Sequence, residues 1–275
     1  MGSRPTSAPV PEPTRPSQLA TPRPVALVTG AARRIGRVIA LDLAAAGWDV
    51  AVHAHRSMDD AAQTAADVRA AGGRAEVYSA DLSDEAACAA LVPCVHGEMG
   101  RLDAVVNNAS LFEHDEVASF GTATLERHLR ANTVAPVLLA RALHAFGGTG
   151  VVVNLLDQKL WNPNPDHFSY TLSKAALLSA TTMLAQALAP RVRVCGVAPG
   201  VTLPSGDMNA AEFAASHRLT PLRRSSTPED VARAVRFLLE SPAITGTTLL
   251  VDGGQHLQAQ PRDVMFLVRE ASVLA

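Results

Sequence analysis

The chain has 275 residues, of which 48 % are hydrophobic and 18 % charged, and its formal net charge is -2. This length is sufficient for one large α/β domain with a sizeable core. The near-neutral charge argues against nucleic acid or an anionic membrane as the main partner, because both usually select a basic excess. No apolar run approaches the roughly 20 residues that a spanning helix needs.

Two features concern the chain outside its core. Residues 1–24 contain seven prolines and three arginines but few apolar residues, so we expect a disordered arm. Residues 25–275 should form one domain that includes a C-terminal tail, 256–275. The three cysteines Cys88, Cys94 and Cys195 lack metal-ligand spacing. They predict reduced thiols in a cytoplasmic protein without a metal site.

Short apolar runs alternate with Ala- and Leu-rich stretches of helical period. The runs are 25–29, 49–54, 75–80, 102–108, 151–156, 192–199 and 247–254, with helical candidates such as 36–47, 59–72 and 173–189 between them. This alternation predicts a Rossmann-like, doubly wound, seven-stranded parallel sheet with helices on both faces. Ligands of such folds bind at the carboxyl ends of the strands, so the residues that follow each run are the candidate site residues.

The first strand is followed by VTGAARRIGR, residues 28–37. Gly30 and Gly36 permit a tight turn, and the helix that begins near Ile35 offers free N–H groups to a pyrophosphate. The middle glycine of the usual dinucleotide pattern is replaced by Arg34. Arg33 and Arg34 can add positive charge at the phosphates, although both are also common as solvated first-turn residues.

The second strand ends in VHAHRS, with no carboxylate that could hold a ribose 2′-hydroxyl. Instead it supplies four polar residues: His53, His55, Arg56 and Ser57. Asp49 lies at the start of the strand, roughly 13 Å away at about 3.3 Å per residue. This pattern favours NADP(H) over NAD(H). A zinc pair at His53 and His55 is the alternative, but it lacks further ligands.

Polar residues also follow the third and fourth strands. After the third come Asp81 and Leu82, where Asp81 can accept a hydrogen bond from adenine, or else Asp81 or Ser83 caps the next helix. After the fourth come residues that suit a backbone lying along the cofactor or, alternatively, an Asx turn: Asn108, Ala109 and Ser110.

Tyr170 and Lys174 lie four residues apart at the start of a helical stretch, so they share one helix face. An ammonium about 4 Å from a phenol would lower its pKa by up to about three units and make it a usable proton donor. Asp157 follows the fifth apolar run, and its carboxyl group is expected to lie beside them.

Together these motifs resemble the short-chain dehydrogenase/reductase family over residues 24–255. The matching segments are TGAARRIG, DLS, NNA, Asn132 in ANTVAP, YTLSK, APG at 198–200 and VDGG at 251–254. The resemblance implies that Tyr170 is the acid, that Lys174 holds the nicotinamide ribose, and that Asn132 supports a proton relay. It also places a short segment near the nicotinamide: Pro199, Gly200, Val201 and Thr202.

Within the family, the chain looks most like the pteridine reductase and dihydromonapterin reductase branch. Four features are shared: the arginine at 34, HAHRS, NNAS, and Asp157 where most members have serine. The resemblance implies that Phe112 stacks on a pterin, with Arg34, Ser110, Asp157 and Tyr170 also at the substrate. The alternative for Phe112 is a core position. Residues 158–168 and those after Gln255 follow no assignable pattern.

The sequence therefore predicts an NADPH-dependent reductase of a pterin or folate ring. A reductase of sugar, steroid or 3-oxoacyl carbonyls is the nearest alternative, and a non-catalytic dinucleotide sensor is the second. The resemblance also implies a homotetramer that uses the helices around 131–146 and 173–189. The tail, residues 260–275, has an apolar centre and should dock on a surface, with a neighbouring subunit's pocket as one candidate.

Overall fold

A computed structural model of the chain describes residues 22–206 and 208–273. Most of the predicted proline-rich arm, residues 1–21, lies outside this range. Arg23 already belongs to the folded domain, because its guanidinium donates to the Gly72 carbonyl at 2.8 Å and pairs with Asp49 at 3.2 Å. The Pro24 carbonyl accepts a hydrogen bond from the Asp49 N–H. The ordered domain thus includes residues that we had assigned to the arm.

The core is a seven-stranded sheet in which every neighbouring pair is parallel, as predicted. Its order is β3-β2-β1-β4-β5-β6-β7. The strands are β1 (Val25–Val28), β2 (Asp49–Ala54), β3 (Ala75–Ser79), β4 (Ala104–Asn107), β5 (Gly150–Leu155), β6 (Val192–Pro199) and β7 (Thr248–Val251). Their apolar, β-branched sequences suit a sheet that is buried on both faces.

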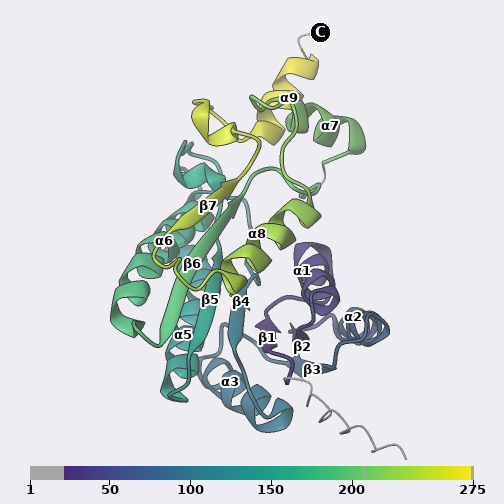
Figure 1. Cartoon of the computed structure of the whole chain (residues 1–275). Coiled ribbons are helices and arrows are strands. Elements are labelled where there is room, and N and C mark those ends of the chain that lie inside the picture. The colour runs from purple at the N-terminus through teal and green to yellow at the C-terminus, as the bar shows by residue number, and fades with distance from the viewer. Residues whose placement is uncertain (1–21, 207, 274–275) are drawn as a thin grey trace, which may run out of the picture.

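Helices cover both faces of the sheet (Figure 1). One hydrophobic cluster joins the sheet to α1 (Arg34–Ala45), α2 (Met58–Ala70) and α8 (Pro228–Glu240). The other joins it to α3 (Glu85–Met99), α5 (Ala135–Ala145) and α6 (Phe168–Leu188). Successive residues point to opposite faces, so Val28 packs in the first cluster and Leu27 in the second.

The remaining elements lie largely around the carboxyl ends of the strands. They are α4 (Thr122–Leu129), α7 (Ala210–Arg218), α9 (Val264–Val273), the π-helical turn η1 (Arg130–Val134) and the short 3-10 helices η2 (Gln158–Leu160) and η3 (Gln255–Leu257). Figure 1 shows α7 and α9 together at one end of the molecule. Within the described range, no helix has the length and apolar character needed to cross a membrane.

Candidate active site

The turn after β1 packs so tightly around Gly36 that there is no space for a side chain at this position. A Cβ there would lie 2.3 Å from the Gly30 carbonyl oxygen and 2.5 Å from the Asn108 amide nitrogen. Gly30 itself adopts φ +63°, in the left-handed region that favours glycine. The side chain of Asn108 fixes the turn by donating to the Thr29 carbonyl at 2.8 Å. Thr29, which sequence reasoning missed, accepts the Asn108 and Ala109 N–H groups through its hydroxyl.

Arg34 adopts φ +56°, in the left-handed region that favours glycine. A left-handed conformation costs a non-glycine residue roughly 1–2 kcal/mol. The guanidinium donates to the Pro204 carbonyl at 2.9 Å, so it reaches across from the first turn to the loop after β6. Arg34 consequently lines both the cleft beside β1–β4 and the cavity beside β5–β6.

His53 lines the cleft but is a structural link instead of a cationic ligand. Its Nδ1 accepts the Gly30 N–H at 3.2 Å, and its Nε2 lies 3.1 Å from the Ala80 carbonyl, to which it donates in the corresponding tautomer. Burial lowers the pKa of His53 to about 4, so the ring is neutral at pH 7. Of the four polar residues on which the preference for NADP(H) was based, His53 therefore contributes no positive charge. With both nitrogens occupied, the zinc alternative fails as well.

The other predicted residues at the end of β2 remain available. His55 and Arg56 are exposed, and His55 lies 3.8 Å from Asp81. Hydrogen bonds from the Ser83 hydroxyl and N–H hold the pKa of Asp81 below its ordinary value, and the nearby side chains of His55 and Arg56 act in the same direction. Asp81 does not cap the next helix, because Asp84 does so by accepting the Ala87 N–H.

The cleft brings together every residue that we predicted from the first four strand ends. They are Gly30, Arg33, Arg34, Ile35, Gly36, His53, His55, Arg56, Ser57, Asp81, Leu82, Asn108, Ala109 and Ser110. Arg127 of α4 and Glu113, which pair at 2.7 Å, also line it and were not predicted. The open cleft, its tight glycine turn and its exposed Arg56 fit a phosphorylated dinucleotide.

Asp157 and Tyr170 meet at the end of β5. The Tyr170 hydroxyl donates to Asp157 Oδ2 at 2.9 Å, and the Lys159 N–H donates to Oδ1 at 2.8 Å. Burial raises the pKa of Asp157 above its ordinary value, although these two bonds oppose the shift. Burial and then the Asp157 charge raise the pKa of Tyr170 well above 10. The two groups thus form a hydrogen-bonded acid pair in which Tyr170 is buried and Asp157 half-buried.

Lys174 lies near the Tyr170 ring but donates its hydrogen bond elsewhere, and its expected lowering of the Tyr170 pKa stays a prediction. Its Nζ donates to the Leu155 carbonyl at 2.7 Å and lies 5.8 Å from the centroid of the Tyr170 ring. The phenol is instead bonded to a carboxyl group, which makes deprotonation harder. Burial lowers the pKa of Lys174 to about 8, and the charge of Asp157 opposes this shift.

Asn132 is buried in η1, where the helix widens by one residue per turn. Its side chain is fully engaged: Oδ1 accepts the Leu111 N–H at 2.7 Å, and Nδ2 donates to the Leu111 carbonyl and to Ser173 Oγ. It therefore anchors the loop after β4 against α6. The relay role that the resemblance implies stays a prediction.

Phe112 faces the cavity and is 43 % exposed, so its alternative as a core residue is wrong. Its ring stacks on His167 at 4.2 Å and meets the Tyr170 ring edge-on at 4.7 Å. The same cavity contains the segment predicted to lie near the nicotinamide, Pro199–Thr202, together with Asp157 and Tyr170. An aromatic face beside an acid pair suits a flat, nitrogen-containing ring.

The far wall of this cavity comes from segments that sequence reasoning did not assign. These residues are Gln158, Lys159, Asn164, Leu203, Ser205, Met208, Gln255, Gln260, Asp263 and Val264. The tail therefore docks on its own subunit's cavity. One sequence signal could have pointed here: Lys159 and Lys174 are the only lysines in the chain.

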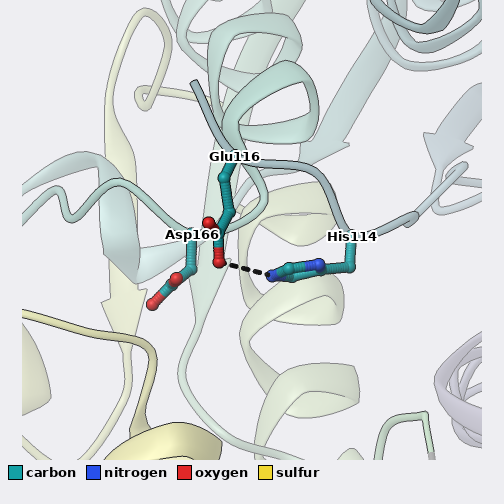
Figure 2. A group of neighbouring side chains, drawn as sticks. All are labelled: His114, Glu116 and Asp166. Atoms are coloured by element: carbon teal, nitrogen blue, oxygen red, sulfur yellow. Dashed lines mark ion pairs between the residues drawn. The ribbon is translucent and has the colours of Figure 1, made fainter. Parts of the chain in front are cut away.

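Figure 2 shows His114, Glu116 and Asp166, whose possible metal-ligand atoms lie within 4.8 Å of one another. The Arg262 guanidinium forms ion pairs with both carboxylates, at 2.8 Å from Asp166 and 3.5 Å from Glu116. A metal ion would have to displace this cation. We therefore interpret the group as an ion-pair network that attaches the tail.

A glycine-rich turn, a cleft along four strand ends and an adjoining acid pair define a dinucleotide-dependent oxidoreductase. Comparison with known proteins gives the family. A family model described as enoyl-(acyl carrier protein) reductase matches residues 30–256. The chain belongs to the short-chain dehydrogenase/reductase family, as its motifs predicted.

Some of the similar proteins are named for pteridine or dihydrofolate reduction, and another is named as a ketoacyl reductase. The crystal structure of FolM alternative dihydrofolate reductase 1 from Brucella canis, complexed with NADP, has a TM-score of 0.82 and 42 % identity, covering 87 % of this chain and 96 % of that one. Pteridine reductase 1 of Leishmania tarentolae is 33 % identical over 85 % of this chain and 96 % of its own. A Streptomyces violaceoruber protein described as a granaticin polyketide synthase ketoacyl reductase is 38 % identical, with the same coverage.

Proposed function

We propose that the protein is an NADPH-dependent reductase of a pterin or folate ring. The observation that carries this proposal is the 2.9 Å hydrogen bond between the Tyr170 hydroxyl and the Asp157 carboxyl group, beside the exposed ring of Phe112. A pterin presents N–H donors and is protonated on nitrogen, and a carboxyl group can accept from the former and supply protons to the latter. The relatives named for pteridine and dihydrofolate reduction support the same substrate class.

The cleft at the first four strand ends would hold NADPH, which supplies the hydride. The N-terminus of α1 and the turn at Gly30 would face the pyrophosphate. The side chains of His55, Arg56 and Ser57 would receive the 2′-phosphate. Lys174, from the far side of the acid pair, would hold the nicotinamide ribose, and Pro199–Thr202 would border the ring.

The acid pair would handle the proton. Tyr170 holds its proton firmly, because the pKa of the buried phenol is raised. It releases that proton when the substrate ring nitrogen becomes strongly basic upon reduction. Asp157 orients the ring by accepting an N–H and shares the proton with Tyr170, so that the two groups titrate as one coupled pair. Phe112 holds the ring flat.

Reduction of a carbonyl substrate is the second candidate, and the 38 % identical ketoacyl reductase favours it. A carbonyl oxygen that develops negative charge is poorly served by a neighbouring carboxylate, which is why we rank it second. A non-catalytic sensor is third, since the acid pair, Lys174 and Asn132 are all present.

One assay separates these three candidates. NADPH consumption would be followed with dihydrobiopterin, dihydrofolate and a panel of ketones that includes a 3-oxoacyl thioester. We expect turnover of the two dihydropterin compounds and little turnover of the ketones. Ketone turnover alone would make the protein a carbonyl reductase, and the absence of any turnover with intact NADPH binding would make it a sensor.

The assembly and location are further proposals. Exposed apolar side chains on the two helices that the resemblance implicates support a homotetramer: Met183 and Leu172 on α6, and Val134 just before α5. Light scattering at micromolar concentration should give four times the mass of the chain. The free thiols Cys88, Cys94 and Cys195 support a cytoplasmic location, which cell fractionation would test.

A further inference from the structure

The two lysines of this chain occupy unusual positions. Lys159 and Lys174 are the only lysines among 24 lysine and arginine residues, and both are buried and interact electrostatically with Asp157. Lysine carries a compact ammonium group that loses its charge more readily than a guanidinium when buried. Lys174 has a place in the proposed function, whereas Lys159 has none so far.

Lys159 contacts Asp157 through its backbone N–H, and its ammonium group lies among acidic and carbonyl groups of the neighbouring segments. Its N–H fixes one carboxyl oxygen of Asp157 at 2.8 Å, while Tyr170 holds the other oxygen. Its ammonium donates to the Asp166 carbonyl at 2.5 Å and lies 3.7 Å from the Asp263 carboxylate. The charge of Lys159 opposes the effect of burial on Asp157.

Asp263 reaches this position because the tail is clamped to the loop after η2. The Asp166 carboxylate, 2 % exposed, accepts two hydrogen bonds from Arg262 Nε and Nη2 and one from the Asp263 N–H at 2.7 Å. Asp263 Oδ1 in turn accepts the Met265 N–H at the start of α9. The tail thereby fixes a negative charge in the cavity wall beside Lys159.

We propose that Lys159 and Asp263 are positioning residues for the acid pair: Lys159 orients the Asp157 carboxyl group, and the opposite charges of Lys159 and Asp263 together set its protonation. This inference rests on the proposed catalytic use of Asp157 and Tyr170. It assigns a role to two segments that followed no sequence pattern, the loop 158–168 and the tail.

The sign of each contribution follows from charge alone. The Lys159 ammonium stabilises the Asp157 carboxylate, and the Asp263 carboxylate destabilises it and the Tyr170 phenolate. Removing the Lys159 charge should therefore raise the apparent pKa of the acid pair. Removing the Asp263 charge should lower it. The remaining charged or titratable groups around the pair and its two neighbours are Lys174, Asp166, His167, His114 and Arg262, and these stay unchanged.

The experiment compares pH–rate profiles of kcat/KM for the full-length parent, Lys159→Met, Asp263→Asn and the double variant, with NADPH and the best substrate. We expect the inflection of the acid pair to rise by about 0.5 to 1 pH unit in Lys159→Met and to fall by a similar amount in Asp263→Asn. The double variant should return close to the parent. Asp263→Asn keeps an amide oxygen that can accept the Met265 N–H.

Matched controls carry the same charge changes away from the carboxyl ends of the strands: Arg191→Met just before β6 and Glu240→Gln at the end of α8. Neither should move the inflection. Shifts in the same direction for both cavity variants, or none, would overturn the proposal. If Lys159→Met does not fold, Asp263→Asn alone decides the outcome through the sign of its shift.

A separate variant, Asp157→Asn, tests the proposed function itself. Asp157→Asn should remove the inflection. If it leaves the profile intact, the acid pair is not catalytic and the proposed function fails with it. If Asp157→Asn alters the profile but the Lys159 and Asp263 variants do not, only the present inference fails. The comparison works with any substrate that the parent reduces, because the inflection belongs to the pair.

Discussion

The cofactor cleft and the substrate cavity lie side by side and share Arg34, Ile35 and Asn108, but they are built differently. The cleft is lined mainly by residues that directly follow β1 to β4. The cavity combines the end of β5, the loop after β6 and a tail nearly a hundred residues beyond Asp166, which Arg262 and Asp263 contact. The cofactor cleft is therefore formed by residues that are close to a strand end in the sequence. The substrate cavity depends on contacts between segments far apart in the sequence.

The largest effect is expected from a substitution that disrupts the cofactor cleft. Gly36→Ala would put a methyl group 2.3 Å from the Gly30 carbonyl oxygen, a backbone atom that cannot move without opening the turn. We expect a loss of more than 100-fold in NADPH affinity, or of the folded protein. Gly97→Ala on α3 is the matched control, because its Cβ meets nothing within 4 Å; it should raise stability by about 0.5–1 kcal/mol. Fluorescence titration and thermal unfolding measure both, and normal NADPH binding by Gly36→Ala would refute this account.

The next largest effect is expected from a substitution that changes the substrate cavity and leaves the cofactor cleft intact. Asp157→Ser should reduce dihydropterin turnover by about 100-fold or more, because the acid pair loses its charged member. NADPH affinity should change little, and turnover of simple ketones could even increase. Steady-state kinetics with both substrate classes measure this contrast. If the serine variant reduces dihydropterins as fast as the parent, Asp157 is a bystander and the carbonyl reductase proposal takes the lead.

A smaller effect sharpens the description of the cleft. Arg56→Ala should lower the preference for NADPH over NADH by about ten- to a hundredfold, because a charge-assisted contact with a phosphate contributes roughly 1.5 to 3 kcal/mol. The control, Arg74→Ala, removes an arginine that pairs with Glu76 at the edge of the sheet. Specificity constants for both cofactors provide the measurement. An unchanged preference in Arg56→Ala would assign the 2′-phosphate to other residues.

The smallest effect concerns the attachment of the tail and its pH dependence. Burial by itself would raise the pKa of Asp166, but hydrogen bonds from Arg262 and the Asp263 N–H hold it below its ordinary value. A carboxyl group with a lowered pKa stabilises the fold at pH values above its unfolded pKa, about 3.9, and this stabilisation disappears as pH falls through the folded pKa.

We therefore expect α9 to lose hydrogen-exchange protection below about pH 4. Asp166→Asn should produce a similar loss at pH 7, of about 1–3 kcal/mol in local stability. Hydrogen exchange monitored over residues 264–273 at several pH values is the measurement, with α8 as the internal reference. Protection of α9 that does not change with pH would show that apolar packing alone holds the tail.

The comparison also explains where sequence reasoning succeeded in the site. Asp157 and Tyr170 were paired correctly, because a strand end and the first turn of the next helix are close in any parallel sheet of this type. Lys174 shares a helix face with Tyr170, but its ammonium points to the Leu155 carbonyl. This hydrogen-bond partner was not predicted, since rotamers and hydrogen-bond partners are decided by packing.

The sequence by itself determined the seven parallel strands, the glycine turn and the polar strand ends, because hydrophobic period and turn chemistry act over a few residues. Only the tertiary structure decided that His53 is neutral, since burial and two backbone partners act on it together. It likewise decided that Asp263 lies beside Lys159. Such a contact depends on closing a loop of about a hundred residues, and no local pattern in either segment specifies it.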